Sequence, residues 1–136
     1  MSGHVYDLRV YYEDTDLAGI VYHANYLKFI ERARTEALID AGIDQAVLRA
    51  ETGRVFAVRR IEADFISPAR FQDLLRVETR AGEVRGARAE LAQEVRRGDD
   101  MLFRARVEVV CLGSDGRARR LPEAVRAALS GFRSPD

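Results

Sequence analysis

Residues 23–42, HANYLKFIERARTEALIDAG, decide the fold because they predict its one long helix. Apolar residues recur there at spacings of three and four, which is the period of one helical face. Glycine at position 42 stands where a helix C-terminal cap is expected, so the helix has about five turns. Its small residues allow the apolar face to lie close against a sheet. The apolar positions are Tyr26, Phe29, Ile30, Ala33, Ala37, Leu38 and Ala41.

On both sides of this helix, the apolar pattern changes to the two-residue alternation of β-strands. Residues 6–12 predict a first strand, and four more are expected at 55–66, 73–84, 87–97 and 100–112. Short glycine-containing turns join the last three strands as antiparallel hairpins. Unbroken alternation in the strand at 55–66 puts one set of residues on a single face: Val55, Ala57, Arg59, Ile61, Ala63 and Phe65.

The order of these elements predicts an α+β protein, in which an antiparallel five-stranded sheet wraps around one long central helix. Pro122 opens a short terminal helix that runs to about Leu129. With 136 residues the chain fits a single domain, 1–136. One sheet around one helix leaves its other face and an edge uncovered. We therefore expect a homodimer, which can assemble further to a homotetramer.

Charge and cysteine content narrow the class of protein. The chain has 22 basic and 22 acidic residues, so no basic field is present to hold nucleic acid. The single cysteine, Cys111, lies in a strand pattern that predicts a buried small hydrophobe. The N-terminal MSGHVYDLRV lacks a basic start followed by an apolar stretch, and no segment has membrane-spanning length. We expect a cytoplasmic protein.

The polar segment at residues 13–21, between the first strand and the helix, holds the strongest candidate for chemistry. Asp16 there lies close to the N–H groups and positive dipole of the helix start. The N–H of His23 or Ala24 could polarise a carbonyl, while the Asp16 carboxylate acts as a nucleophile or as a general base. The alternative is structural, because Asp and Thr before a helix are most often caps or turn formers. For His23 the alternative is a partly exposed structural histidine.

The continuous string at residues 10–34, VYYEDTDLAGIVYHANYLKFIERAR, resembles hot-dog-fold acyl-CoA thioesterases related to 4-hydroxybenzoyl-CoA thioesterase. Within that group it is most similar to the branch associated with the Tol-Pal envelope system. The resemblance continues through FISPARFQD and the final VVCL, and it implies the hot-dog fold. It also implies that Asp16 is the catalytic carboxylate and that the amide of His23 faces the thioester carbonyl. The His23 side chain is implied as an auxiliary, and Tyr12 and Tyr22 match the motif as wall or substrate-binding residues.

An acyl-CoA substrate carries phosphates, which need cations or amides near the mouth of the site. Arg85 and Arg88 match the region where related thioesterases present basic side chains to the nucleotide. Weaker candidates are Arg59, Arg60 and Arg70. The alternative for all five is a solvated surface charge. No metal or other cofactor is expected, because His4 and His23 are the only histidines and no cluster has ligand spacing.

Three functions compete. The leading hypothesis is hydrolysis of an acyl-CoA thioester to a free acid and coenzyme A, with acyl carrier protein as another thiol carrier. A hydroxyacyl dehydratase is disfavoured because the acid precedes the helix and no Phe-Pro segment follows His23. The third is a non-catalytic acyl-binding or envelope-associated interaction module, since a fold alone never fixes function.

Overall fold

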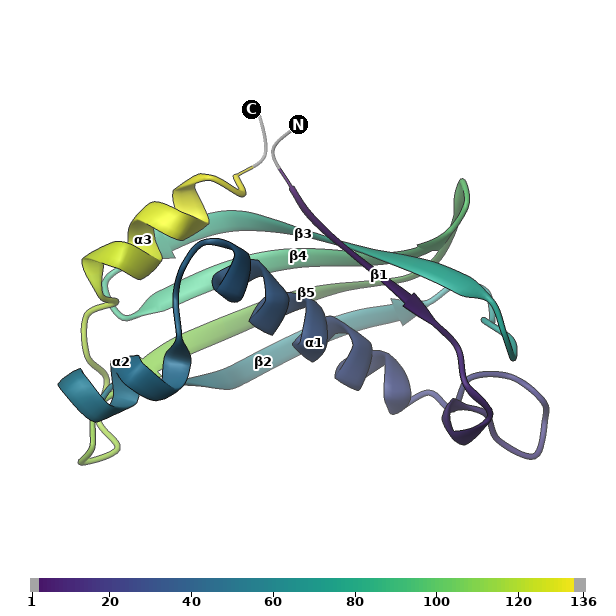
Figure 1. Ribbon diagram of the computed structural model, residues 1–136, viewed down its shortest axis with the longest axis horizontal. Helices are drawn as coiled ribbons and strands as arrows, with labels where there is room; N and C mark the ends of the chain where they lie inside the picture. The colour runs from purple at the N-terminus through teal and green to yellow at the C-terminus, as the bar shows by residue number, and fades with distance from the viewer. Residues whose placement is uncertain (1–2, 134–136) are drawn as a thin grey trace.

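The computed structural model describes residues 3–133 (Figure 1). A strand and a 3-10 turn come first, followed by two helices, four long strands and a terminal helix. These elements are β1 (His4–Arg9), η1 (Tyr12–Asp14), α1 (Asn25–Asp40), α2 (Gln45–Thr52), β2 (Val55–Phe65), β3 (Leu74–Arg85), β4 (Arg88–Arg97), β5 (Asp100–Leu112) and α3 (Glu123–Ser130).

The five strands form one antiparallel sheet in the order β1-β3-β4-β5-β2. β2 and β1 are therefore its edges. β1 pairs only with the first half of β3, from Leu74 to Thr79. Beyond that point, the chain after α3 continues the edge, where the Ala81 N–H donates to the Phe132 carbonyl at 2.8 Å.

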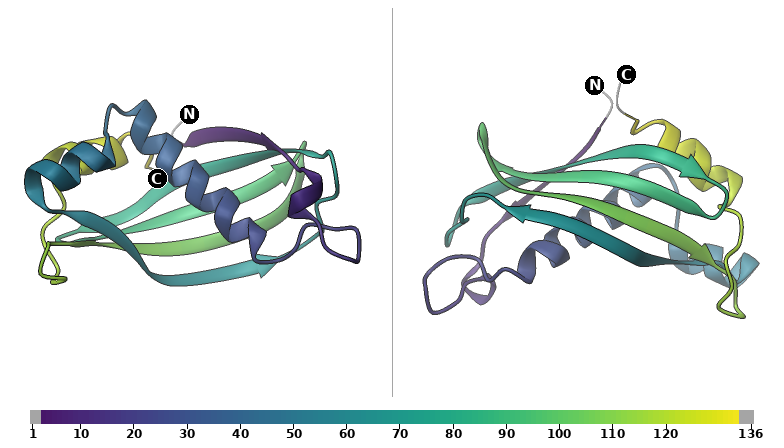
Figure 2. Two further views of the ribbon diagram at one scale, coloured as in Figure 1. Left: turned by 60° about the horizontal axis from the view of Figure 1, so that its bottom comes forward. Right: turned by 180° about the vertical axis from the view of Figure 1, so that it is seen from behind.

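Helix α1 crosses one face of the sheet, and Figure 2 shows the opposite face with no helix on it. The helix buries its apolar stripe, including Phe29, Ile30 and Ala33, against strand side chains. Gly42 follows the helix with φ +85°, in the left-handed region that glycine adopts readily. The expected α+β fold, a five-stranded sheet around one long helix, is confirmed.

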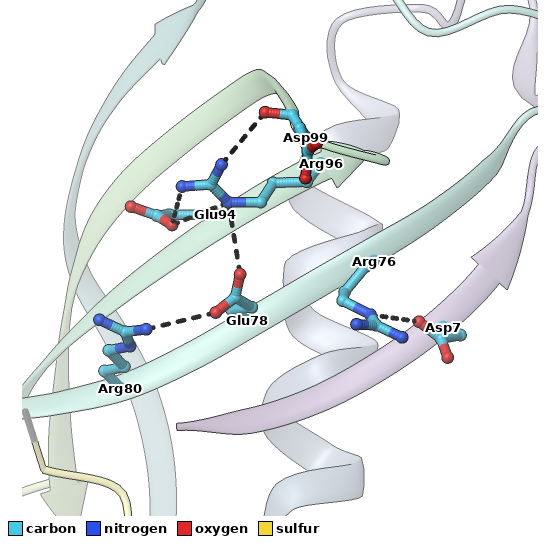
Figure 3. Close-up of polar contacts among 7 residues, drawn as sticks. All are labelled: Asp7, Arg76, Glu78, Arg80, Glu94, Arg96 and Asp99. Atoms are coloured by element: carbon cyan, nitrogen blue, oxygen red, sulfur yellow. Dashed lines mark hydrogen bonds and ion pairs between the residues drawn. The ribbon is translucent and has the colours of Figure 1, made fainter. Parts of the chain in front are cut away.

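The face without a helix carries charged side chains that pair across neighbouring strands. Glu78 on β3 accepts from Arg80 at 3.3 Å and pairs with Arg96 of β4 at 3.3 Å (Figure 3). Arg76 pairs with Asp7 of β1 at 3.1 Å. Arg76 and Asp7 are directly opposite, whereas Glu78 lies opposite Glu94 and reaches Arg96 diagonally. Such exposed ion pairs suit a surface facing water.

Four local expectations need correction. The first strand ends at Arg9 instead of Tyr12, because residues 12–14 turn into a 3-10 helix. The long helix begins at Asn25, and His23 lies in the turn before it. Helix α2 was not predicted, although Asp44 accepts hydrogen bonds from Ala46 and Val47 as its N-cap.

The fourth correction concerns the alternation in β2. A bulge between Val58 and Arg60 adds one residue and exchanges the two faces of the strand. Phe56 before the bulge and Ile61 after it therefore both pack on the helix side, despite their odd spacing. The expected single face from Val55 to Phe65 is wrong for this reason.

The sheet has two unlike ends. At one, which we name the Asp16 end, β1 and β2 finish and residues 13–22 form a loop. At the other, the helical end, α2 and α3 lie beside the β3–β4 turn (Figure 1). Each end has its own buried apolar cluster.

Candidate active site

Asp16 lies on a small hairpin that the chain forms before α1. Its N–H donates to the Ile20 carbonyl at 2.9 Å, and Thr15 pairs with Val21 across the hairpin. Gly19 has φ +81° at the tip, where a side chain would be strained. Val21 then donates to the Ala69 carbonyl at 2.9 Å, which fixes the hairpin to the segment between β2 and β3.

The Asp16 carboxylate is half-buried and partly engaged. Oδ1 accepts from the Ala18 N–H at 2.9 Å, an i to i+2 contact typical of an Asx turn. Oδ2 makes no hydrogen bond to residues 3–133. The turn-forming role and an available oxygen therefore exist together in one side chain.

The start of α1 leaves two amides open. Asn25 donates to the Tyr22 carbonyl at 2.8 Å, and Tyr26 donates to the His23 carbonyl at 3.4 Å. The N–H groups of His23 and Ala24, in contrast, donate to no acceptor in the described part of the chain. No side chain caps this helix start. These two amides have the character of a carbonyl-polarising site.

Asp14 has a structural role that separates it from Asp16. Its Oδ2 accepts from the Tyr11 N–H at 2.8 Å. Its carbonyl accepts from the Tyr22 N–H at 3.0 Å and from Asn25 Nδ2 at 2.8 Å. Asn25 thus ties the loop to the first turn of α1. Sequence reasoning missed Asn25, whose only signal was an amide side chain at the helix start.

Aromatic side chains pack around the start of α1. The His23 ring is exposed and lies between Tyr22, at 4.6 Å between centroids, and Phe65, at 6.1 Å. Beneath them, Tyr26 stacks on Phe103 at 4.9 Å. The Tyr26 hydroxyl accepts from the Ala69 N–H at 3.1 Å. Burial raises the pKa of the Tyr26 phenol, against a lowering by that hydrogen bond.

The predicted site residues divide between the two ends of the sheet. The Asp16 end has Asp16, His23, Tyr22 and Tyr12, although Tyr12 is 81% exposed and contacts Phe71 edge-on. Arg85 and Arg88 lie at the helical end, where the β3–β4 turn is. β3 has 12 residues, or 11 steps of about 3.3 Å, so roughly 35 Å separates the ends of the strand near which the two groups lie. One protomer does not bring them together.

The candidate nucleotide-binding arginines also differ in whether they form ion pairs. Arg88 pairs with Glu108 at 3.0 Å and Glu83 at 3.4 Å, so its charge is already compensated. Arg85 is exposed and forms no ion pair with the described residues. Of the weaker candidates, Arg59 and Arg60 pair with Glu108 and Glu62, respectively. The Arg70 side chain is exposed at the Asp16 end.

A cavity of about 220 Å³ lies at the helical end, between α1, the sheet and α3, and Asp16 is not among its lining residues. Arg34 lines it and donates to the buried Gln93 at 3.0 Å. Sequence reasoning missed both. The signal was present for Gln93, which takes an inward position in the alternation Ala89, Leu91, Gln93, Val95.

Within residues 3–133, no group of three or more His, Cys, Asp or Glu side chains is placed to hold a metal ion. None of the helices in that range combines the length and apolar character of a membrane span.

Comparisons with known proteins agree with this fold and sequence. A family model described as the thioesterase superfamily matches residues 18–104. An acyl-CoA thioesterase named YbgC, from Haemophilus influenzae, is 42% identical over 93% of this chain and 94% of its own length. A 1,4-dihydroxy-2-naphthoyl-CoA hydrolase from Thermosynechococcus vestitus is 30% identical over 84% of this chain and 79% of its own.

Among solved structures, a probable thioesterase from Bartonella henselae superposes with a TM-score of 0.85 at 40% identity. That alignment covers 88% of this chain and 99% of the other. The resemblance drawn from residues 10–34 is thereby confirmed, and the name YbgC among the relatives is consistent with the expected branch. The chain belongs to the thioesterase superfamily.

Proposed function

We propose that the protein hydrolyses the thioester of an acyl-CoA to a free carboxylic acid and coenzyme A. One observation carries this proposal. The Asp16 end of the sheet has both the backbone N–H groups of His23 and Ala24, which have no acceptor among the described residues, and Asp16 Oδ2, which has no donor there. The amides stabilise the oxyanion that forms on the thioester carbonyl. The names of the YbgC relatives support the choice of acyl-CoA as substrate.

Asp16 supplies the negative group of the reaction. As a nucleophile it attacks the carbonyl carbon, expels the coenzyme A thiolate and leaves a mixed anhydride for water to open. As a general base it removes a proton from the water that attacks instead. Both routes use the same carboxylate, and the His23 side chain helps to orient water or substrate. Tyr12 and Tyr22 are proposed as contacts to the substrate.

The test is thiol release from short, long and aromatic acyl-CoAs by the wild type and by Asp16→Asn. Asn retains an oxygen for the Ala18 N–H, so the hairpin is preserved. We expect kcat to fall by about a thousandfold. The matched control is Glu13→Gln, which removes an exposed carboxylate from the same loop and should leave the rate unchanged. Full activity in Asp16→Asn would refute the catalytic role of Asp16. No thiol release by the wild type would refute the proposed hydrolysis and favour a non-catalytic acyl-binding module.

A homodimer is proposed as the functional unit. β2 is an edge strand of 11 residues, and Val55, Val58 and Phe65 on it are exposed. Antiparallel pairing of two copies of β2 would join the sheets and cover these side chains. The Asp16 end of one protomer would then lie toward the helical end of the other. This arrangement brings Arg85 and Arg88 of one copy toward the substrate of its partner.

Sedimentation should give at least twice the 15.3 kDa of one chain, and a homotetramer gives four times that mass.

For the nucleotide contact, Arg85→Ala should raise KM for acyl-CoA several-fold with little change in kcat. Arg88→Ala should have a smaller effect, because Glu108 and Glu83 already compensate its charge. The same assay with an acyl carrier protein thioester tests the other thiol carrier.

A further inference from the structure

Residues 22–25 form a turn that contains the two open amides of the candidate site. The N–H of Asn25 donates to the Tyr22 carbonyl at 2.8 Å, which closes the turn. His23 and Ala24 are its two central residues, and the central N–H groups of such a turn take no part in the closing hydrogen bond. The direction of both amides therefore depends on how the turn as a whole is held.

One backbone carbonyl, that of Asp14, holds both ends of this turn. It accepts from the Tyr22 N–H at 3.0 Å and from Asn25 Nδ2 at 2.8 Å. Only the nitrogen end of an amide side chain can face a carbonyl, since the oxygen end has no hydrogen to donate. The Asn25 contact is partly buried, so water competes for it less than at the surface. The turn is thus fixed at two points instead of one.

The same carbonyl lies close in the chain to the candidate carboxylate. Thr15 joins Asp14 to Asp16 and pairs across the hairpin, which holds the Asp16 backbone in place. The Asn25 side chain therefore fixes the turn with the open amides to the hairpin with the carboxylate. Without Asn25 Nδ2, the Tyr22 N–H alone would hold the Asp14 carbonyl, and the turn could rotate about that single contact.

We propose that Asn25 is a positioning residue, which directs the His23 and Ala24 amides toward the carbonyl oxygen of the thioester. This inference rests on the proposed function. Asn25 touches no reacting atom in this role, because its donor is engaged by Asp14. It acts through the amides, whose hydrogen bonds strengthen as negative charge develops on the oxygen. Its contribution therefore belongs to kcat and not to KM.

Thiol release by Asn25→Ala tests the proposal on the full chain. The Asp14 carbonyl keeps the Tyr22 N–H as a donor, so the variant should fold, with an unfolding midpoint only a few degrees lower. We expect kcat to fall by about tenfold or more, because a small displacement of catalytic groups is costly in rate. KM for acyl-CoA should stay within about twofold of the wild type.

Asp44→Ala is the matched control. It removes a side chain that accepts from two backbone amides at the start of α2, at the helical end, so it also lowers stability. Its kcat should equal that of the wild type. An equal loss of kcat in Asp44→Ala and Asn25→Ala would overturn the proposal, because the rate would then follow stability alone.

Hydrogen exchange gives a readout that needs no turnover. The backbone amides of residues 22 and 25 should exchange about tenfold faster in Asn25→Ala than in the wild type, since the turn is then held at one point. Unchanged exchange would overturn the proposal. Faster exchange with a wild-type kcat would also overturn it, because the contact would then be structural only.

A second variant keeps the test decisive if Asn25→Ala does not fold. Asn25→Ser retains a residue type that is well accepted at a helix start, but its hydroxyl ends one bond short of Nδ2. The same fall in kcat is expected, and a wild-type kcat would overturn this inference alone. No thiol release by the wild type would instead overturn the proposed function, and the role of Asn25 with it.

Discussion

The two ends of the sheet use the same helix and the same strands but pack them differently. At the Asp16 end, Phe29 and Phe103 are fully buried and Tyr26 stacks on Phe103, so large rings fill the space under the loop. At the helical end, aliphatic side chains surround a cavity. The difference teaches that one helix packed on one sheet can have a closely packed core beneath the Asp16 loop and an open cavity at its other end.

The largest expected difference comes from the same truncation made at each end. Leu102 is fully buried in the cluster of the Asp16 end, and Leu91 borders the cavity. Leu102→Ala should lower the free energy of unfolding by about 3–4 kcal/mol, and Leu91→Ala by about 2 kcal/mol, because Leu91 has fewer neighbours to lose. Urea unfolding of both variants measures this. Equal losses would mean that the helical end is as densely packed as the other.

The reverse change, from small to large, should separate the ends in the same way. Ala33 and Ala37 lie one turn apart on α1, both are buried, and only Ala37 lines the cavity. Valine costs both sites the same helix propensity, about 0.5 kcal/mol. Overpacking adds about 1–3 kcal/mol for Ala33→Val, whereas Ala37→Val has space to occupy. Thermal unfolding should therefore show a clearly lower Tm for Ala33→Val alone. A matching loss in Ala37→Val would contradict an open cavity.

Most of this architecture was predictable because its periodicity is strong. The stripe from Tyr26 to Ala37 predicts α1, and β3, β4 and β5 lie within a residue or two of their expected bounds. The β2 bulge was not predictable, since an inserted residue between Val58 and Arg60 leaves the composition of the strand unchanged. Helix α2 is only eight residues long, too short for a clear period, although Asp44 and Gly53 mark its ends.

For the candidate site, the sequence predicted residues whose roles stay predictions, and it predicted little of their geometry. The loop sequence singled out Asp16 and the helix start, and the structure adds that Asp14 serves as a cap for the Tyr11 amide. Placing Arg85 and Asp16 at opposite ends required strand direction, which no local pattern gives. The Arg34–Gln93 contact joins residues 59 positions apart, so it depends on how α1 lies across β4.

The buried hydroxyl of Tyr26 gives the Asp16 end a dependence on pH. Tyr26→Phe should cost about 1–2 kcal/mol at pH 7, because the Ala69 N–H loses its acceptor. Burial raises the pKa of Tyr26 above its ordinary value of about 10, so the phenol stays protonated longer in the folded chain. Its contribution to stability is complete below pH 10 and is lost as pH rises through the folded pKa.

Urea unfolding between pH 7 and 11 measures the difference in the free energy of unfolding between the wild type and Tyr26→Phe. We expect this difference to become smaller above pH 10. Tyr12→Phe is the control, since Tyr12 is mostly exposed and its variant should follow the wild type throughout. A gap that stays constant to pH 11 would contradict a buried phenol at this position.

The smallest expected difference compares one ion pair at each end. Asp73 accepts from Arg97 and from the Arg70 N–H, both at 2.8 Å, and its side chain is mostly covered. Asp115 accepts from Arg119 at 2.7 Å in an exposed turn. Asp73→Asn should cost about 1 kcal/mol, and Asp115→Asn less, because solvent screens exposed pairs.

Acid titration separates the two contributions. The hydrogen bond from the Arg117 N–H lowers the pKa of Asp115. Slight desolvation acts against this lowering, and the charge of Arg119 adds to it. A lowered folded pKa stabilises the chain above the unfolded pKa of about 3.9, and this contribution is lost as pH falls through the folded value. The difference between the wild type and Asp115→Asn should therefore disappear in urea unfolding at pH 2–3, and also at pH 7 in 1 M salt. An equal loss of unfolding free energy in Asp115→Asn and Asp73→Asn would contradict this prediction. The exposed ion pair at the helical end would then stabilise the fold as much as the covered pair at the Asp16 end.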